Sequence, residues 1–395
     1  MKKRLAALVA LVAATAAALA ATAVAGPESV ASTSQAVSCK STFTLPLITP
    51  VTGGGGFIGT EQATWGRFAV KTLAPQMGLK VKFVTGDTPV EKGPGEGLVV
   101  AQKFISNKSV VAVIGPSTSG AVASASKALD AAGLAHISPS ATRTSLTKGS
   151  NLEATKSFFR VVPGDYIQGP TDANYMADKL GAKKVAIVDF QEPYSVGLAD
   201  AAESVLKKKG VSVTRLSTSV NTTDYSSLVT RVASDTDIVF FPTQQPADAQ
   251  TFGQQLLEQG KKAKVFGGDG SNSPGQFKLP GSYVSNFAPD ISGIASSKAL
   301  IDGWKKDNPS ATLGSFGPPT YLAVQVALNA IKKACDAGKG TIKNRRDVVR
   351  QVKKINLKSS ILGGPFRFST KSNDPLNAKF YIFQIQSNGS YKLVG

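Results

Sequence analysis

Two short segments rich in serine and threonine hold the residues best suited to bind a charged group. Residues 115–120 read GPSTSG, and residues 138–142 read SPSAT. Hydroxyl groups and the free N–H groups of a helix N-terminus are good hydrogen-bond donors to an anion. We therefore expect these segments to hold a carboxylate if the fold brings them together.

The flanking residues predict the elements that position both segments. Residues 110–114, VVAVI, predict a strand buried on both faces, and residues 134–137 predict a second strand. Between them, residues 121–129 are good helix formers that follow candidate N-cap hydroxyls. A strand-helix-strand unit of this kind is a right-handed crossover between parallel strands, so both turns come to the carboxyl edge of the sheet. Open α/β sheets bind ligands at that edge.

The same alternation of strands and helices continues along the chain. Strands are expected at 41–48, 79–84, 110–114, 134–137 and 157–162, and after Pro163-Gly164 at 184–189, 211–216, 237–241 and 263–267. Helices are expected near 60–75, 95–106, 166–180, 194–209, 225–233, 246–259, 297–306 and 320–335. Short strands at 366–368, 380–386 and 391–394 end the chain. The pattern predicts an α/β protein with two doubly wound parallel-sheet lobes.

The N-terminal residues predict export. Lys2, Lys3 and Arg4 precede an uncharged run, and Ala23-Val24-Ala25 is a typical cleavage site, so we expect a signal peptide at 1–25. An uncleaved membrane anchor is the alternative, since the run is long enough to span a bilayer. Residues 26–40 are expected to be a disordered spacer.

The chain has two cysteines, Cys39 and Cys335. Cys39 lies too far beyond the apolar run for a lipoprotein cysteine, so we do not expect lipidation. An even number of cysteines in an exported protein favours a disulfide between them. Two free, buried thiols remain the alternative, because the sequence fixes no geometry.

The formal net charge is +19, of which three positive charges precede the uncharged run. The lysines are dispersed and few aromatic residues lie among them, so we expect no nucleic-acid partner. Attraction to an anionic surface of the cell envelope explains the charge at least as well. For any single lysine cluster, an ordinary solvated helix end is the simplest interpretation.

Several enzymatic or cofactor-binding patterns are incomplete. The glycines at 53–56 lack the lysine and spacing of a phosphate-binding loop. Ser119 occupies the position where a nucleophile elbow needs its second glycine, and S-x-x-K at 124–127 has no companion motif. The only histidine, His136, lies in an apolar strand and is expected to be buried and structural. We expect no enzyme, no metal and no cofactor.

Taken together, these residues resemble the type I periplasmic binding proteins of bacterial ABC importers, in particular the group that binds branched-chain amino acids (Leu/Ile/Val). The resemblance covers residues 42–394. It rests on Val113-Ile114-Gly115, Ile137 to Thr142 with Leu146-Thr147, Gln168-Gly169-Pro170-Thr171, Tyr194 with Gly197-Leu198-Ala199, and Gly268-Asp269-Gly270.

The resemblance implies two lobes, joined by three hinge segments, that close on one ligand. Lobe 1 would comprise 41–163 plus 287–365, and lobe 2 would comprise 164–286 plus 366–395. Such a protein would capture a small zwitterionic solute, such as an amino acid, and deliver it to an ABC permease. We expect a monomer in the periplasm, or on the outer face of the cytoplasmic membrane and cell wall. An exported sensor or scaffold that is not coupled to transport is the alternative.

The resemblance also assigns roles to individual residues. Ser119 and Thr142 would hold the ligand carboxylate, and the backbone carbonyl of Ser140 would accept from the ammonium group. Asp269 would pair with that ammonium, although an aspartate before glycine also fits an ordinary turn. Tyr194 would cover the ligand from the second lobe. The side-chain pocket would be lined by Ser117, Thr118 and Phe316.

Two departures from the group concern the ligand's side chain. Thr243-Gln244-Gln245 stands where leucine-binding members have a tyrosine, and Ser117 and Thr118 make the pocket more polar. These departures favour an amino-acid-like ligand and disfavour leucine, isoleucine or valine itself.

Overall fold

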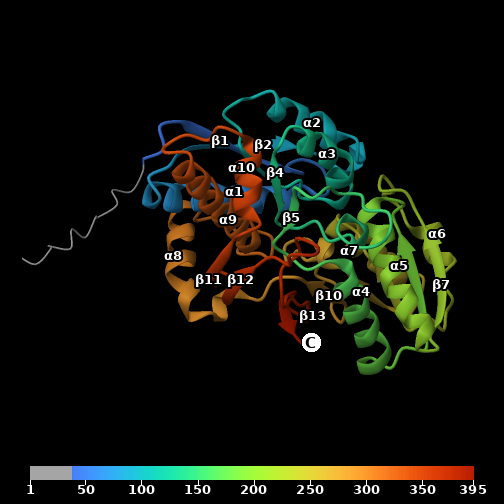
Figure 1. Cartoon of the computed structure of the whole chain (residues 1–395). Coiled ribbons are helices and arrows are strands. Elements are labelled where there is room, and N and C mark those ends of the chain that lie inside the picture. Colours follow the sequence, from blue (N-terminus) through green and yellow to red (C-terminus); the bar gives the residue numbers. More distant parts are fainter. Residues whose placement is uncertain (1–37) are drawn as a thin grey trace, which may run out of the picture. The chain divides into compact units, whose positions relative to one another are not determined.

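The computed structural model describes residues 38–395 (Figure 1). The expected signal peptide, its alternative as an anchor, and residues 26–37 of the expected spacer therefore lie outside the described residues. Within residues 38–395, no helix is both long enough and apolar enough to cross a membrane.

The first sheet has five parallel strands in the order β2-β1-β3-β4-β5. Its strands are β1 (Thr42–Thr49), β2 (Lys80–Asp87), β3 (Ala112–Ile114), β4 (Ala135–Ser138) and β5 (Phe158–Arg160). The helices associated with it are α1 (Gly56–Gln76), α2 (Glu96–Ile105), α3 (Ser119–Ala131), α8 (Lys298–Asp307), α9 (Gly317–Ala337) and α10 (Arg345–Val352). The expected β-α-β unit is β3-α3-β4, with β3 and β4 paired in parallel.

The second sheet has seven strands in the order β14-β13-β10-β9-β8-β6-β7. Its strands are β6 (Lys184–Asp189), β7 (Ser212–Ser217), β8 (Ile238–Phe241), β9 (Lys264–Gly267), β10 (Tyr283–Asn286), β13 (Tyr381–Ile385) and β14 (Tyr391–Leu393). Its helices are α4 (Asp165–Asn174), which continues as a π-helical turn over Tyr175–Lys179, α5 (Pro193–Lys208), α6 (Ser226–Thr230) and α7 (Pro246–Glu258).

The second sheet is not entirely parallel. β13 pairs antiparallel with β10, and β14 pairs antiparallel with β13. A connection of a few residues joins β13 to β14, and such a short connection can link only antiparallel strands. The parallel expectation therefore holds for β6 to β10 and fails at this edge.

The chain passes between the two sheets three times: between β5 and β6, after β10, and before β13. β11 (Asn356–Ser360) and β12 (Gly364–Arg367) form a separate two-stranded ribbon. β12 spans the lobe boundary expected at 365/366, and Phe366 and Phe368 pack in the core of the first sheet. The exact residues at which the chain divides between the two lobes therefore remain a prediction. Short 3₁₀ helices cover Val90–Lys92, Thr144–Leu146, Asp269–Ser271, Ile291–Gly293 and Ala295–Ser297.

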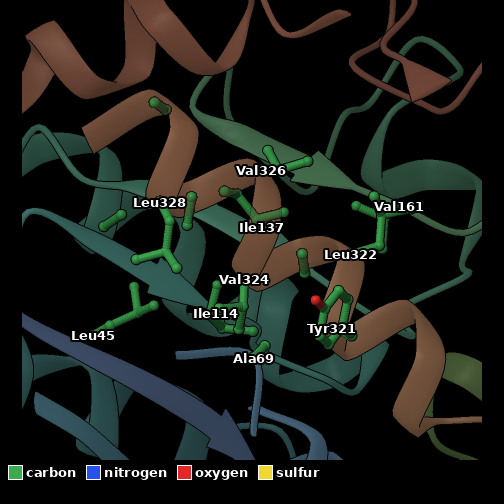
Figure 2. Packing of buried hydrophobic residues seen from close by; sticks show 14 of the residues in the cluster. Leu45, Ala69, Ile114, Ile137, Val161, Tyr321, Leu322, Val324, Val326 and Leu328 are labelled. Atoms are coloured by element: carbon green, nitrogen blue, oxygen red, sulfur yellow. The ribbon is translucent and has the colours of Figure 1, made fainter. Parts of the chain in front are cut away.

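Helix α9 is the centre of the first core. Figure 2 shows Leu45, Ile114 and Ile137 of the strands gathered with Val324, Val326 and Leu328 of α9, and all six side chains are fully buried. Each such side chain contributes about 1.5–3 kcal/mol to folding when it leaves water. The helix is apolar on most of its surface because strands cover one side and α1 and α10 cover others.

Close packing fixes where α9 begins. Trp65 of α1 stacks on Trp304 of α8, with ring centroids 4.7 Å apart. A Cβ added to Gly317 would lie 2.0 Å from Cδ1 of Trp65. Only glycine fits at this position, and the N-terminus of α9 is held directly against α1.

Cys39 and Cys335 form a disulfide, with their Cα atoms 6.0 Å apart. This confirms the pairing and excludes the alternative of two free thiols. The bridge ties the start of β1 to the end of α9 across a separation of 296 residues.

Two helices differ from expectation. α1 begins at Gly56 rather than near Thr60, because the expected glycine-rich loop includes the first turn of the helix. At Gly59, a Cβ would lie 1.9 Å from the carbonyl oxygen of Pro50, so glycine here permits close packing of helix on loop. α10 was not expected, because only Val348, Val349 and Val352 are buried in a mainly basic segment.

Candidate functional site

The two hydroxyl-rich turns lie side by side at the carboxyl ends of β3 and β4, as expected. Ser138 Oγ donates a hydrogen bond to the carbonyl of Pro116 over 2.7 Å. Ser140 Oγ donates to the carbonyl of Ser117, also over 2.7 Å. These bonds join the turns into one rigid unit.

Gln62 of α1, which sequence reasoning missed, satisfies the inner hydroxyls of this unit. Its Oε1 accepts hydrogen bonds from Thr49 Oγ1 and Ser117 Oγ, each over 2.7 Å. Its Nε2 donates to Ser140 Oγ over 3.0 Å. The hydroxyl of Ser117 is thus directed to Gln62, and its role in a ligand pocket remains a prediction.

The groups left available are those that the resemblance assigned to a carboxylate. Thr142 Oγ1 is buried and has no hydrogen-bonding partner of good geometry among the described residues. Ser119 Oγ accepts from the backbone N–H of Arg143 over 3.2 Å, which leaves its own proton free to donate. Ser119 is also the first residue of α3, where the helix dipole favours an anion.

Thr118 has a structural role as the N-cap of α3. Its Oγ1 accepts from the N–H of Ala121 over 3.4 Å. It also lines a cavity of about 20 Å³ to which Glu192, Pro193 and Gln244 contribute from the second sheet's side. Residues that follow strands of both sheets therefore meet at this point.

Arg160 of β5 holds the second turn in place. Its Nη1 donates to the carbonyls of Thr142, Arg143 and Ala141, over 2.6, 3.0 and 3.3 Å. Its Nε donates to Asp374 Oδ1 over 2.7 Å, and both side chains are almost fully buried. Because the guanidinium is occupied in this way, it serves the turn and the segment before β13 rather than an open pocket.

Asp269 and Tyr194 meet on the side of the second sheet. Tyr194 OH donates to Asp269 Oδ1 over 3.0 Å and accepts from the N–H of Gly270 over 3.0 Å. Both side chains are buried. Tyr194 is set by the start of α5, where Glu192 caps the helix by accepting from the N–H groups of Tyr194 and Ser195.

Burial raises the pKa of Asp269 to about 6, while hydrogen bonds from Gln168 and Tyr194 act in the opposite direction. A carboxyl group in this state becomes a strong partner for a cation, because ionisation is costly until a counter-charge arrives. The pairing of Asp269 with an ammonium group remains a prediction.

A second acidic residue, Asp165, lies between the turn and Asp269. Its backbone N–H donates to the carbonyl of Thr142 over 2.8 Å, and neither carboxylate oxygen has a well-formed partner in residues 38–395. Burial, and to a smaller extent the charge of Asp269, raise the pKa of Asp165 to about 7. The Thr142 hydroxyl and the charges of Arg160 and Arg143 act in the opposite direction and lower this pKa. The sequence signal was available, since Asp165 directly follows Pro163-Gly164 at the start of α4.

A polar chain extends from Asp269 into the second sheet. Gln168 Nε2 donates to Ser285 Oγ over 2.9 Å, and Ser285 Oγ donates to Asp172 Oδ2 over 3.0 Å. Burial raises the pKa of Asp172 well above its ordinary value. Three acidic side chains, Asp165, Asp172 and Asp269, are thus buried close enough for their charges to interact.

Arg143 connects the two sides of the site. Its Nη1 donates to the carbonyl of Pro193, which is the first residue of α5. Its charge lowers the pKa of Glu192, which burial raises to about 7. The side chain of Arg143 therefore bridges from the second turn to the start of α5.

Phe316 lies apart from the polar groups, in an aromatic cluster. Its ring meets those of Phe57 and Phe287 edge to face, at centroid distances of 5.5 and 5.4 Å. Phe57 lines a cavity of about 480 Å³ with Glu61 and the loops at 272–276 and 311–314. None of the eight expected ligand residues lines that cavity, so Phe316 remains a prediction as a pocket residue.

Two other sequence interpretations can be compared with the structure. The glycine-rich loop already directs its N–H groups to carboxylates of this chain, since Val51 and Thr52 donate to Asp87. His136 is fully buried, and its Nδ1 lies 3.1 Å from the carbonyl of Leu134. Burial lowers its pKa to about 4. The expected structural role of His136 is confirmed.

A family model described as "Periplasmic binding protein" matches residues 42–390 of this sequence. The chain belongs to the periplasmic binding protein family. A curated relative, the Leu/Ile/Val-binding protein BraC3 of Rhizobium johnstonii, is 28% identical over 315 residues, which is 78% of this chain and 84% of the relative.

Solved structures show that the fold is that of periplasmic binding proteins. The leucine-binding protein LivK of Thermotoga maritima matches with a TM-score of 0.79 at 20% identity, over 89% of this chain and 98% of that one. The substrate-binding protein LivJ of Streptococcus pneumoniae, solved with isoleucine, matches with a TM-score of 0.76 at 24% identity, over 90% and 99%. The expected family and the two-sheet α/β fold are confirmed.

Proposed function

We propose that this periplasmic binding protein captures an amino acid or a similar small zwitterion and delivers it to an ABC permease. The observation that carries the proposal is the presence of two complementary sets of groups. One set is hydroxyls that can still donate a hydrogen bond, and the other is a buried carboxyl without a counter-charge among the described residues. Ser119 and Thr142 offer hydroxyls at one side, and Asp269 offers a buried carboxyl at the other. These groups complement a carboxylate and an ammonium in one molecule.

The arrangement explains how binding would stabilise the closed protein. An ammonium group beside Asp269 supplies the counter-charge that the buried carboxyl lacks, and the effect is larger away from water. A carboxylate at the N-terminus of α3 gains hydroxyl bonds and the helix dipole. The ligand would therefore join groups that follow strands of both sheets.

The names of the relatives support the same class of ligand. BraC3 is named a Leu/Ile/Val-binding protein, and LivJ was solved with isoleucine. The polar residues Ser117 and Thr118, together with Thr243-Gln244-Gln245, favour an amino acid other than leucine, isoleucine or valine here. We place the protein outside the cytoplasmic membrane, where an importer collects its solute.

A thermal-shift screen of the protein against all amino acids and small amino-acid analogues tests the proposal. A ligand that binds only the folded state raises the melting temperature. We expect at least one α-amino acid to do so with the parent. Asp269→Asn should lose most of that shift, because the ammonium would then be buried without a counter-charge.

Glu258→Gln is the matched control, since it removes the same charge from an exposed carboxyl in α7. It should retain the shift of the parent. An equal shift in the parent and in Asp269→Asn would reject the site. No shift with any zwitterion would reject an amino acid as the ligand. If an amino acid gives a shift but its import into cells does not depend on this protein, the sensor or scaffold alternative is favoured.

A further inference from the structure

The excess positive charge is confined to one part of the protein. Residues 164–286 and 381–395, which contain the seven-stranded sheet, hold thirteen basic and thirteen acidic residues. Residues 38–163 and 287–380 hold twenty-nine basic and twelve acidic residues, a formal net charge of +17. An overall bias in composition would have charged both parts, so the asymmetry points to a particular surface.

The charge is densest around α10. The twenty residues from 339 to 358 contain eight basic residues and one acidic residue, Asp347. Seven of the exposed basic side chains in and beside this segment form what we call the basic patch: Lys40, Lys339, Lys343, Arg346, Arg350, Lys353 and Lys354. Lys339, Lys343 and Arg350 line one surface depression of about 410 Å³.

The fold places these side chains on one exposed face. Val348, Val349 and Val352 are buried and fasten α10 to the first core, so the basic residues of the helix are left on its outer side. The backbone N–H of Lys40 donates to the carbonyl of Gly340 over 3.0 Å, which brings the start of β1 to the same face. The patch therefore combines residues nearly 300 positions apart.

Much of the patch lacks compensating charge. Arg350 pairs with Asp347, and Arg346 pairs with Asp130 at 3.3 Å. Lys40, Lys343, Lys353 and Lys354 have no ion pair within residues 38–395. Such a cluster of like charges raises the free energy of the isolated protein and lowers it beside an anionic surface.

Two observations indicate which surface. No aromatic residue occurs from 333 to 365, so the patch has no platform on which nucleic-acid bases could stack. The uncharged run at 5–25 predicts export, and an exported protein first meets the surface of the membrane that it has crossed.

We propose that the basic patch docks this protein on a membrane surface rich in anionic phospholipid. Lysine and arginine side chains gain free energy near such a surface, and the attraction weakens beyond a Debye length of about 10 Å at 0.1 M salt. Arg346 of the patch pairs with Asp130 near the end of α3, whereas Ser119 of the candidate ligand site begins that helix, so docking leaves solute binding intact. The inference is independent of which solute the protein carries.

Vesicle co-sedimentation tests the proposal, with mixed phosphatidylglycerol and phosphatidylcholine vesicles against pure phosphatidylcholine vesicles. The patch variant carries Lys40→Glu, Lys343→Glu, Lys353→Glu and Lys354→Glu. The matched control carries the same change at four exposed lysines of the neutral part that form no ion pair in the described chain, Lys183→Glu, Lys208→Glu, Lys262→Glu and Lys278→Glu. Both variants change the net charge equally.

We expect the parent to bind anionic vesicles at low salt and to be released by salt. The patch variant should bind at least about tenfold more weakly than the parent, and the control variant should bind within about threefold of the parent. Circular dichroism melting checks that each variant is folded, and the corresponding Lys→Gln set replaces any variant that is not.

Three results would overturn the proposal. The parent could fail to bind anionic vesicles at low salt. The two variants could weaken binding equally, which would show a response to net charge alone. Binding to soluble polyanions such as heparin or DNA without binding to vesicles would assign the patch to a different partner.

Discussion

Replacement of Arg160 by methionine tests how the second hydroxyl-rich turn, at 138–142, is held. The guanidinium donates to three consecutive carbonyls, at 141–143, and to Asp374 Oδ1. Its Nη2 also donates to Thr147 Oγ1 over 2.6 Å. Methionine fills a similar volume but leaves a buried carboxylate without its counter-charge and the carbonyls without their donor.

Breaking a buried ion pair from one side costs about 3–5 kcal/mol, and unsatisfied buried carbonyls add to this cost. We therefore expect Arg160→Met to lower the free energy of unfolding by about 3–5 kcal/mol in urea titrations. The double variant Arg160→Met/Asp374→Leu should be more stable than Arg160→Met alone, because it removes the isolated charge.

The same variants separate stability from ligand binding. In the double variant the turn still lacks the donor that fixed the carbonyl of Thr142, so its ligand affinity should stay below that of the parent even where stability returns. A loss below about 1 kcal/mol for Arg160→Met would refute the reasoning, because that magnitude is typical of an exposed pair. Parent-like affinity in the double variant would show that Arg160 does not position the turn.

Three further variants have definite outcomes. The folded-state pKa of Asp165 is about 7, above its ordinary 3.8, so the folded protein binds the proton more tightly and its stability falls as the pH rises from 3.8 to about 7. Asp165→Asn should therefore raise the free energy of unfolding at pH 8 by at most about 4 kcal/mol. It should also reduce the change of the urea midpoint between pH 5 and pH 8. An unchanged pH profile would contradict this. Tyr194→Phe should cost about 1–3 kcal/mol in urea, because it removes a buried hydroxyl that bonds Asp269 and Gly270; unaltered stability would contradict the bond. Cys39→Ala/Cys335→Ala should lose about 2–4 kcal/mol, and added reductant should then have no further effect, unlike on the parent; equal stability of parent and variant would contradict a structural bridge.

Local sequence patterns predicted the frame of the site well. The apolar runs at 110–114 and 134–137, each followed by a hydroxyl-rich segment, were sufficient to place both turns at one sheet edge, because handedness and strand period leave few alternatives. The basic segment that forms α10 was not predicted to be a helix, because three valines among many charged residues give a weak helical periodicity. Its buried side is evident only once α9 is in place.

The partners inside the site could not be read from local pattern. Gln62 lies 55 residues from Ser117 and 78 from Ser140, yet it bonds both hydroxyls. Arg160 and Asp374 are 214 residues apart. Such contacts depend on how separate elements pack, and a single sequence that is not aligned with its relatives contains no record of them. The roles proposed for Asp269 and Tyr194 came from the resemblance rather than from spacing.

Calorimetric titration with chemically blocked ligands tests zwitterion recognition most directly. The amino acid that gives the largest thermal shift is compared with its N-acetyl derivative, which lacks the ammonium, and with its carboxamide, which lacks the carboxylate. We expect the N-acetyl derivative to bind at least about thirtyfold more weakly, because the buried carboxyl of Asp269 then stays unpaired at about 2–5 kcal/mol. The carboxamide should also bind more weakly, because it loses the charge-assisted hydrogen bonds from the hydroxyls of Ser119 and Thr142. An N-acetyl derivative that binds as tightly as the free amino acid would contradict the pairing with Asp269.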